Sequence, residues 1–86
     1  MYTIEFSSQA KKELKSLPYE VQDRIHEALN ELKVNPYHKG VVKLTSSSKS
    51  NEYRLRVGDY RVIFSVFNRE LVILVLRVRN RKNAYK

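Results

Sequence analysis

The sequence predicts an α+β fold, in which a short strand and two helices come before three further strands. Three observations predict it: residues 2–6 alternate between apolar and polar side chains, apolar residues recur at helical spacing from residue 10 to residue 32, and alternation returns after residue 52. We expect the four strands to form one mainly antiparallel sheet with the helices packed on it as a hairpin, in the order β-α-α-β-β-β. Residues 1–86 are expected to form a single domain.

The opening strand is short and leads directly into the first helix. Tyr2, Ile4 and Phe6 fall on one side of a strand over residues 2–6. Ser7 or Ser8 can then cap a helix, because a serine hydroxyl accepts a hydrogen bond from an N–H group of the first helical turn. The apolar side chains of this helix recur at i, i+4 and i+7 and are Ala10, Leu14 and Leu17.

The second helix is followed by a long connector. Pro18 suits the first turn of this helix, which we expect to end before Asn35-Pro36. Residues 35–51 are expected to be a connector, because they contain a proline, a glycine and a polar run over residues 45–51. The apolar stripe of the helix consists of Val21, Ile25, Ala28, Leu29 and Leu32.

Three strands are expected over residues 52–57, 60–67 and 71–79. Gly58-Asp59 is typical of a two-residue hairpin loop with glycine where a type II′ turn requires it, and this loop places Arg56 directly opposite Arg61. The second turn, residues 68–70, allows two registers. A two-residue loop would put the arginines at 77, 79 and 81 on the face away from Arg61, and a three-residue loop would put them on its face. We prefer the three-residue loop, because it gathers the basic groups.

The charge of the chain is strongly basic and unevenly distributed. Seventeen lysines and arginines stand against nine acidic residues, which gives a net charge of +8. Residues 1–51 contain 8 basic and 6 acidic groups, whereas residues 52–86 contain 9 basic and 3 acidic groups. Charge gathered in one half of a chain indicates a polyanionic partner, either a nucleic acid or an acidic protein segment.

The composition disfavours several classes of site. Cysteine is absent, and His26 and His38 have no second ligand at metal-binding spacing, so we expect no metal site and no cofactor. Only two glycines are present, so a glycine-rich phosphate loop is not expected. The first residues lack a signal-peptide pattern, and the longest apolar run, Leu71–Leu76, is too short to span a membrane. We therefore expect a cytoplasmic protein without a membrane partner.

The residues left to carry chemistry are arginines and tyrosines, which suit phosphodiesters. Arginine binds phosphate oxygens in a bidentate manner and can stabilise the charge that builds up during phosphoryl transfer. Like charges opposed across two strands are unfavourable, by a few tenths to roughly 1 kcal/mol, so the Arg56–Arg61 pair favours an anion site over a solvated basic face. If the anion is RNA, its own 2′-hydroxyl can attack the neighbouring phosphate. Tyr85 could stack on a base or fold back onto the core.

Most of the chain resembles a known family. The pattern Tyr-Arg-x-Arg-x-Gly-x-Tyr-Arg-x-x-Phe over residues 53–64, followed by an apolar strand and by Arg-x-x-x-Tyr over residues 81–85, resembles the RelE/ParE superfamily of toxins from type II toxin–antitoxin modules. The opening strand, the Leu17-Pro18 junction and the Lys43-Leu44 pair extend the resemblance. It implies a toxin with an antiparallel sheet and two N-terminal helices.

The resemblance also implies an activity and partners. RelE-like members cleave messenger RNA in the ribosomal A site, so it implies a ribosome-dependent endoribonuclease that inhibits translation. The implied partners are a short acidic, RelB-like antitoxin, the ribosome with its messenger RNA, and operator DNA through the antitoxin complex alone. The implied catalytic residues are Arg54, Arg56, Arg61, Arg81 and Tyr85. The residues expected to contact nucleic acid are Lys43, Arg77, Arg79, Asn80 and Lys82.

Two features of the chain depart from the RelE pattern. Arg54 and Arg56 stand where relatives often carry lysine, and a guanidinium stays protonated, so it cannot readily act as a base. Asn80 stands where many relatives carry histidine, and an amide performs no acid–base work. Two other functions therefore stay open: a ParE-like inhibitor of DNA gyrase without catalytic activity, and a degenerate toxin that acts only in an antitoxin complex.

Overall fold

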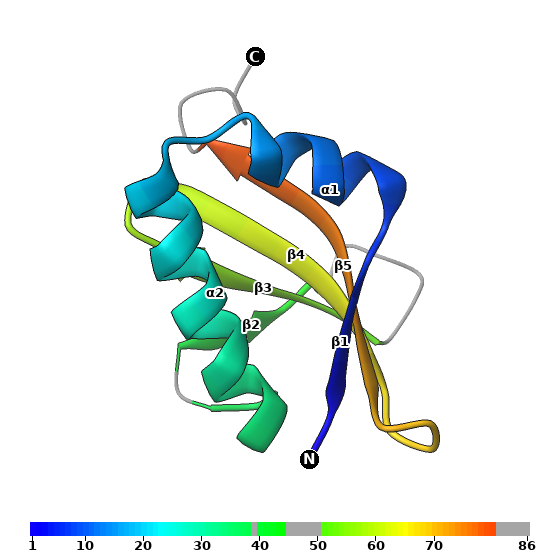
Figure 1. Ribbon diagram of the computed structural model, residues 1–86. Coiled ribbons are helices and arrows are strands. Elements are labelled where there is room, and N and C mark those ends of the chain that lie inside the picture. Colours follow the sequence, from blue (N-terminus) through cyan, green and yellow to red (C-terminus); the bar gives the residue numbers. More distant parts are fainter. Residues whose placement is uncertain (39, 45–50, 81–86) are drawn as a thin grey trace.

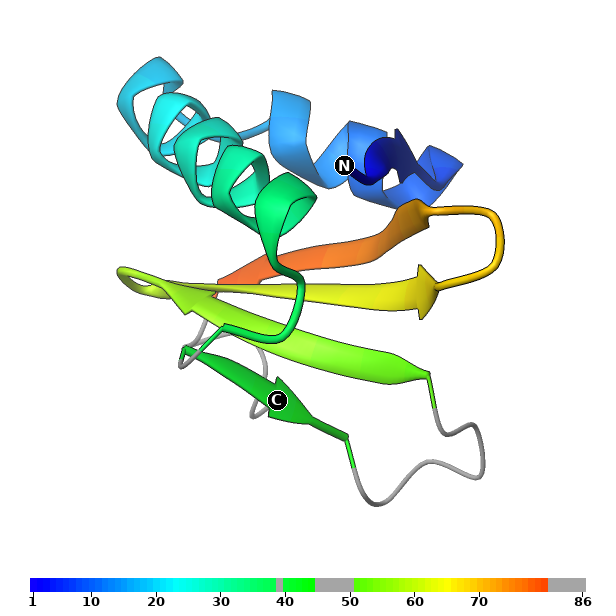
Figure 2. The same ribbon diagram turned by 90° about the horizontal axis from the view of Figure 1, so that it is seen from below.

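Both helices lie on one side of a five-stranded sheet. The computed structural model describes residues 1–38, 40–44 and 51–80. Seen from below, the helices form one layer and the sheet forms the other (Figure 2). The fold is therefore α+β, as predicted. Its elements are β1 (Thr3–Phe6), α1 (Ser8–Lys15), α2 (Tyr19–Val34), β2 (Val41–Lys43), β3 (Glu52–Val57), β4 (Tyr60–Phe67) and β5 (Val72–Asn80) (Figure 1).

The strand order in the sheet is β1-β5-β4-β3-β2. β1 runs parallel to β5, with Thr3 opposite Val72 and Phe6 opposite Val75. The other neighbouring strands are antiparallel. The last strand of the described chain thus lies between the first strand and β4. None of the helices in the described ranges has the length and apolarity that crossing a membrane requires.

The predicted number of four strands is wrong, because part of the connector forms β2. Val41 pairs with Leu55 and Lys43 with Tyr53, in an antiparallel arrangement with β3. Val41 packs against the core, whereas Val42 is 48 % exposed. A three-residue edge strand shows almost no periodicity of its own, so its conformation depends on pairing with β3 rather than on local pattern.

Local sequence sets the ends of both helices. The Ser7 hydroxyl caps α1 by accepting a hydrogen bond from the Ala10 N–H at 3.0 Å. Pro18 occupies the N-cap of α2, and Asn35 follows its last residue, as the Asn35-Pro36 pair predicted. The predicted stripe of α2 faces the core, with Ile25, Leu29 and Leu32 buried and Val21 and Ala28 partly buried.

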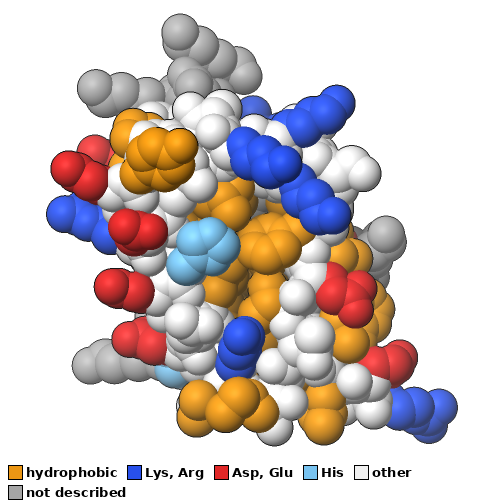
Figure 3. Space-filling view, viewed as in Figure 1, with side chains coloured by type: hydrophobic (Ala, Val, Ile, Leu, Met, Phe, Trp, Pro, Cys, Tyr) orange, Lys and Arg blue, Asp and Glu red, His pale blue; other side chains and the backbone are white. Residues whose placement is uncertain are grey.

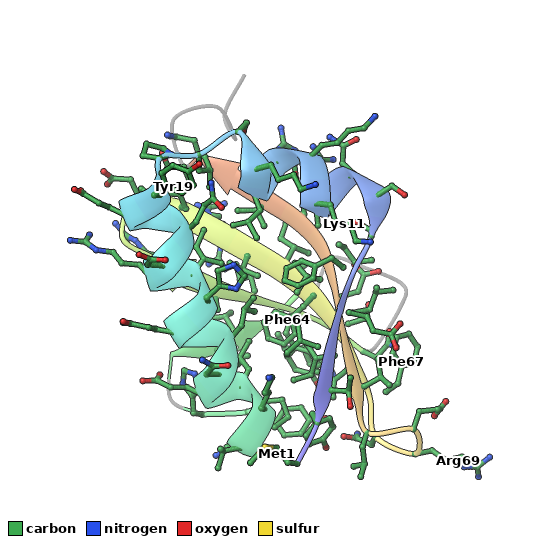
Figure 4. The ribbon with its side chains drawn as sticks, viewed as in Figure 1. Met1, Lys11, Tyr19, Phe64, Phe67 and Arg69 are labelled. Atoms are coloured by element: carbon green, nitrogen blue, oxygen red, sulfur yellow. The ribbon has the colours of Figure 1, made fainter. Side chains whose placement is uncertain are left out.

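The core fills the space between the helices and the sheet. Phe64 lies near its centre and is fully buried (Figure 4), and burying such a side chain contributes roughly 1.5–3 kcal/mol. α1 adds Ala10 and Leu14 to this core, and α2 adds one isoleucine and two leucines. The buried members on the sheet are Leu55, Val62, Phe64, Val66, Ile73, Val75 and Val78.

Aromatic side chains fix the loop that leads from α2 to β2. Tyr37 lies edge-on to Tyr53, which stacks on Phe64, with ring centroids 5.4 and 6.0 Å apart. The hydroxyls of Tyr2 and Tyr37 donate to the side-chain oxygen of Asn68 at 2.6 and 2.8 Å. Burial and the neighbouring Tyr37 raise the pKa of Tyr53. The loop is thereby tied to the N-terminus, to β3 and to the β4–β5 turn.

The turn between β4 and β5 differs from the predicted one. Phe67 pairs with Val72, so the loop contains four residues, 68–71, instead of three. Leu71 has a φ of 55°, in the left-handed region that leucine rarely adopts. A loop of even length alone would have turned the arginines of β5 away from Arg61.

An irregularity in β5 turns the arginines of this strand back to the face of Arg61. Phe64 pairs with Val75, but the next pair is Ile63 with Arg77, so Leu76 is an extra residue in β5. Beyond it, Arg79 stands directly opposite Arg61. The three-residue turn was wrong, and Arg79 nevertheless lies on the face of Arg61, because the longer loop and the extra residue offset each other.

Candidate nucleic-acid interface

The β3–β4 hairpin positions the central pair of arginines. Gly58 has a φ of 59°, whereas Asp59 has no positive φ, which matches the predicted type II′ turn. The pairing of Val57 with Tyr60 then sets Arg56 opposite Arg61. The predicted register of this hairpin is confirmed.

A cavity of about 290 Å³ lies beside this pair. Arg56 is exposed and donates from Nε to the Gly58 carbonyl at 3.4 Å, whereas Arg54 and Arg61 are half-buried. The described residues that line the cavity include three arginines and no acidic residue. Three guanidinium groups around one hollow can bind phosphate oxygens from several sides. The full lining is Gly40, Val42, Arg54, Arg56, Tyr60 and Arg61.

Arg79 extends the pair into a row across three strands. Arg56 on β3, Arg61 on β4 and Arg79 on β5 stand at one level of the sheet. Neighbouring strands are about 4.8 Å apart, so the row spans roughly 10 Å. A second cavity, of about 250 Å³, lies beside Arg79, and its lining is Glu13, Ser16, Leu17, Arg77, Val78, Arg79 and Asn80.

Arg77 is engaged by Glu13 of α1. Arg77 Nη2 donates to Glu13 Oε2 at 2.8 Å, and Arg77 Nε donates to the two carboxylate oxygens at 3.1 and 3.2 Å. Burial raises the pKa of Glu13, but hydrogen bonds from Arg77 and the Val78 N–H outweigh it and hold this pKa below its usual value. The hydrogen bond to Glu13 in turn raises the pKa of Arg77.

The other predicted site residues are scattered. Lys43 is exposed on the edge strand β2, opposite Tyr53. Asn80 is the last residue of β5, pairs with Tyr60 and lines the second cavity. Three predicted residues lie outside the described part of the chain, namely Arg81, Lys82 and Tyr85.

Three residues of the first cavity were not predicted. Tyr60 directly follows the predicted turn and precedes Arg61, so its position could have been found from the register. Gly40 directly precedes β2, and Val42 is the middle residue of that strand. Val42 reaches the cavity because it pairs with Arg54. Their place depends on a strand that the pattern did not indicate. In the ranges that the structure describes, no three His, Asp or Glu side chains are grouped so as to hold a metal ion.

Comparisons with known proteins point to one kind of protein. Residues 4–85 match the family described as the ParE toxin of the type II toxin–antitoxin system parDE. A protein named as the toxin RelE1 of Methanocaldococcus jannaschii is 30% identical over 86 residues, which cover 99% of this chain and 96% of that protein.

Solved structures agree with the sequence matches. A chain of the archaeal RelE–RelB complex from Pyrococcus horikoshii has a TM-score of 0.81 and 35% identity, covering 93% of this chain and 94% of that one. A chain of the RelB–RelE antitoxin–toxin complex from Methanococcus jannaschii has a TM-score of 0.76 and 27% identity, covering 95% of each.

The fold and these likenesses define a toxin of a type II toxin–antitoxin system. The chain belongs to the ParE toxin family, within the RelE/ParE superfamily. The RelE/ParE superfamily, which the sequence motifs indicated, is thereby confirmed.

Proposed function

We propose that this toxin is a ribosome-dependent endoribonuclease that cleaves messenger RNA in the ribosomal A site and so inhibits translation. The observation that carries the proposal is the Arg56–Arg61 pair, set opposite across two strands beside a cavity that Arg54 also lines. Two opposed cations repel each other, and a phosphate bound between them removes that repulsion. The likeness to RelE proteins supports messenger RNA as the substrate.

The substrate would supply its own nucleophile. The 2′-hydroxyl attacks the adjacent phosphorus in line, forming an O2′–P bond while the P–O5′ bond breaks. Arg61 would stabilise the charge on the non-bridging oxygens of the transition state, and Arg54 and Arg56 would hold the side of the attacking hydroxyl. The products are a 2′,3′-cyclic phosphate, or the 3′-phosphate that it yields on hydrolysis, and a 5′-hydroxyl.

Proton transfer would fall to groups other than the strand arginines. A guanidinium is always protonated and so cannot accept the proton of the 2′-hydroxyl. By resemblance we assign Arg81 to the transition state and the leaving group, and Tyr85 to orienting the substrate. The proton acceptor would then be Tyr85, a ribosomal group or solvent. This need for outside groups is a reason to expect little activity without the ribosome.

We further propose that a short acidic, RelB-like antitoxin neutralises this toxin in the cytoplasm. The solved relatives from Pyrococcus and Methanococcus are RelE–RelB complexes. An acidic segment laid across the arginine row would use the donors that a phosphate uses and would exclude RNA from the cavity. Contact with operator DNA would pass through the antitoxin in that complex.

A second candidate is inhibition of DNA gyrase without cleavage. It is favoured by the match of residues 4–85 to the ParE toxin family. In that case the arginine row would bind an acidic protein surface, and the register that brings Arg79 opposite Arg61 would have no catalytic meaning. A toxin active only within its antitoxin complex would inhibit neither translation nor gyrase.

The deciding experiment is primer extension on a reporter messenger RNA in a purified translation system, with and without ribosomes. The wild-type protein should produce cuts within the A-site codon only when ribosomes are present. Arg61→Ala should reduce the cleavage rate by about 10²–10³-fold, as expected when one donor to a transition-state oxyanion is lost. Arg69→Ala is the matched control, because Arg69 is exposed in the β4–β5 turn (Figure 4), beyond the end of β4, whereas Arg61 lies near the start of that strand.

Two results would contradict the proposal. The first is intact messenger RNA together with inhibition of gyrase supercoiling by the same folded preparation. The second is cleavage that leaves 5′-phosphates, since attack by a 2′-hydroxyl leaves a 5′-hydroxyl.

A further inference from the structure

Glu13 joins α1 to the end of β5 through a carboxylate that is 18% exposed. Its Oε2 accepts from Arg77 Nη2 at 2.8 Å, and its Oε1 accepts from the backbone N–H of Val78, also at 2.8 Å. One side chain of the first helix thus binds both a side chain and the main chain of the last described strand. The sequence gives no local sign of this contact, because 64 residues separate Glu13 from Arg77.

This contact lies on the part of β5 that no longer pairs with β1. β1 pairs with β5 only as far as Val75, and the chain then turns into α1. Ser7 Oγ donates to the Leu76 carbonyl at 2.9 Å, and Glu13 accepts from the Val78 N–H. Side chains of the α1 segment therefore take over the edge hydrogen bonds that a longer β1 would have made.

The same stretch of β5 contains its irregular pairing. Leu76 is the extra residue, and Arg79 reaches its place opposite Arg61 only beyond it. A strand end that follows an irregularity and is paired on one side has more freedom to shift than a strand paired on both sides. Glu13 restrains that end at Arg77 and Val78, directly before Arg79.

We infer that Glu13 is a positioning residue for RNA cleavage, which holds the end of β5 so that Arg79 stays level with Arg61. The inference rests on the proposed function. Arg77 then acts through Glu13, because its guanidinium is paired with the carboxylate and the pair has no net charge to attract RNA. Loss of the contact should disturb the geometry of the bound phosphate more than the attraction of RNA to the site.

The test measures kcat and KM for messenger-programmed ribosomes in Glu13→Ala and Glu13→Gln. Glu27→Gln is the matched control, since it removes the same charge from an exposed helical position. We expect kcat to fall by at least about tenfold in Glu13→Ala, with a much smaller change in KM, and to stay at the wild-type value in Glu27→Gln. Glu13→Gln keeps an oxygen acceptor for the Val78 N–H and should lose less.

Two further measurements separate positioning from direct RNA contact. Hydrogen exchange at the Val78 amide should accelerate in Glu13→Ala and not in the control, independently of any activity. In the double variant, Arg77→Ala should add no further loss to Glu13→Ala, because both changes remove one contact.

Three outcomes would overturn the inference in distinguishable ways. Wild-type kcat in Glu13→Ala, with accelerated exchange at Val78, would remove the positioning role and leave the proposed function intact. A rise in KM on Arg77→Ala that persists in the Glu13→Ala background would show that Arg77 binds RNA directly. A wild-type protein that cleaves no messenger RNA would overturn the proposed function, and the inference with it.

Discussion

The facing arginines Arg56 and Arg61 favour anion binding but lower the stability of the folded protein. The hairpin turn at Gly58-Asp59 leaves no freedom in this register, so two guanidinium groups stand opposite each other. The cost is expected to lie between a few tenths and roughly 1 kcal/mol. A surface selected for stability alone would place a threonine or an acidic residue at one of these positions.

Arg56→Thr should therefore stabilise the protein while it impairs cleavage. We expect the free energy of unfolding to rise by a few tenths to about 1 kcal/mol at low salt, and the gain to shrink at high salt because ions screen the repulsion. Urea unfolding at two ionic strengths measures both effects. Arg54→Thr is the control, since Arg54 lies on the same strand as Arg56 but stands opposite Ile63 of β4 instead of an arginine. A stability loss in Arg56→Thr at low salt would contradict the prediction.

Gly58 should tolerate asparagine better than alanine. Its φ of 59° lies in the left-handed region, and no heavy atom beyond its two chain neighbours lies within 4 Å of the position that a Cβ would occupy. The cost of Gly58→Ala is therefore a backbone cost, of about 1 kcal/mol, and Gly58→Asn should cost less because asparagine adopts this region more readily. Thermal unfolding of both variants tests this. Equal losses in both would point to a cause other than backbone conformation.

At the scale of elements, the sequence predicted what long patterns determine and missed what pairing determines. The apolar stripe of α2 recurs over about three turns, and the tight hairpin turn defines its own register, so both were predictable from local sequence. β2 has three residues and depends on β3 for its hydrogen bonds. Relative to the predicted three-residue loop, the four-residue loop and the extra residue Leu76 each shift the register of β5 by one step. The two shifts cancel, so the predicted face of Arg79 was correct although the predicted loop was wrong.

The candidate site followed the same rule. The pairing of Arg56 with Arg61 depends on a local turn and was predicted. The approach of Gly40 and Val42 to the cavity depends on β2, and the Glu13–Arg77 contact joins segments at opposite ends of the described chain. Such contacts leave no periodic signal, because neither partner's neighbours reveal the other.

The Glu13 contact should make stability depend on acid pH. Hydrogen bonds from Arg77 and Val78, with a longer one from Gln9 at 3.4 Å, hold the pKa of Glu13 below its usual 4.5 in the folded state. Because the folded pKa is the lower one, its stabilisation is fully present above pH 4.5 and is lost as pH falls through the folded value.

Wild type should therefore lose more stability than Glu13→Gln between neutral and acid pH. We expect a difference of about 1 kcal/mol, at the low end for a charged hydrogen bond because Arg77 is 39% exposed. Urea unfolding across this range measures it, with Glu27→Gln as the control. An identical pH dependence in wild type and Glu13→Gln would contradict the assignment.

At the scale of the whole molecule, acidic and basic groups gather on different parts of the surface. Acidic groups follow the exposed side of α2 and basic groups gather over α1, with an apolar hollow between them (Figure 3). The arginine row lies on the sheet, away from these acids. A body with this arrangement turns in the field of a polyanion so that its basic side approaches first. The exposed acidic residues of α2 are Glu20, Asp23, Glu27 and Glu31.

The salt dependence of KM should therefore report which arginines meet phosphates. KM for programmed ribosomes should rise steeply with salt, and each phosphate contact to single-stranded RNA should add about 0.7 to the logarithmic slope. Arg79→Ala should lower the slope by about that amount. Arg77→Ala should leave the slope unchanged, because Arg77 is paired with Glu13. Equal slopes for Arg79→Ala and wild type would exclude Arg79 from the contact.

The strand order also sets when the arginine row can exist during biosynthesis. A nascent chain is made from β1 onward, and β1 finds its partner only when β5 enters the gap between β1 and β4. Pairing of such distant segments is slow compared with closing a hairpin. Until β5 is inserted, Arg79 is not in place opposite Arg61. The strand edge that Glu13 binds is also missing. A chain that stalls or is cut before β5 therefore lacks one end of the row.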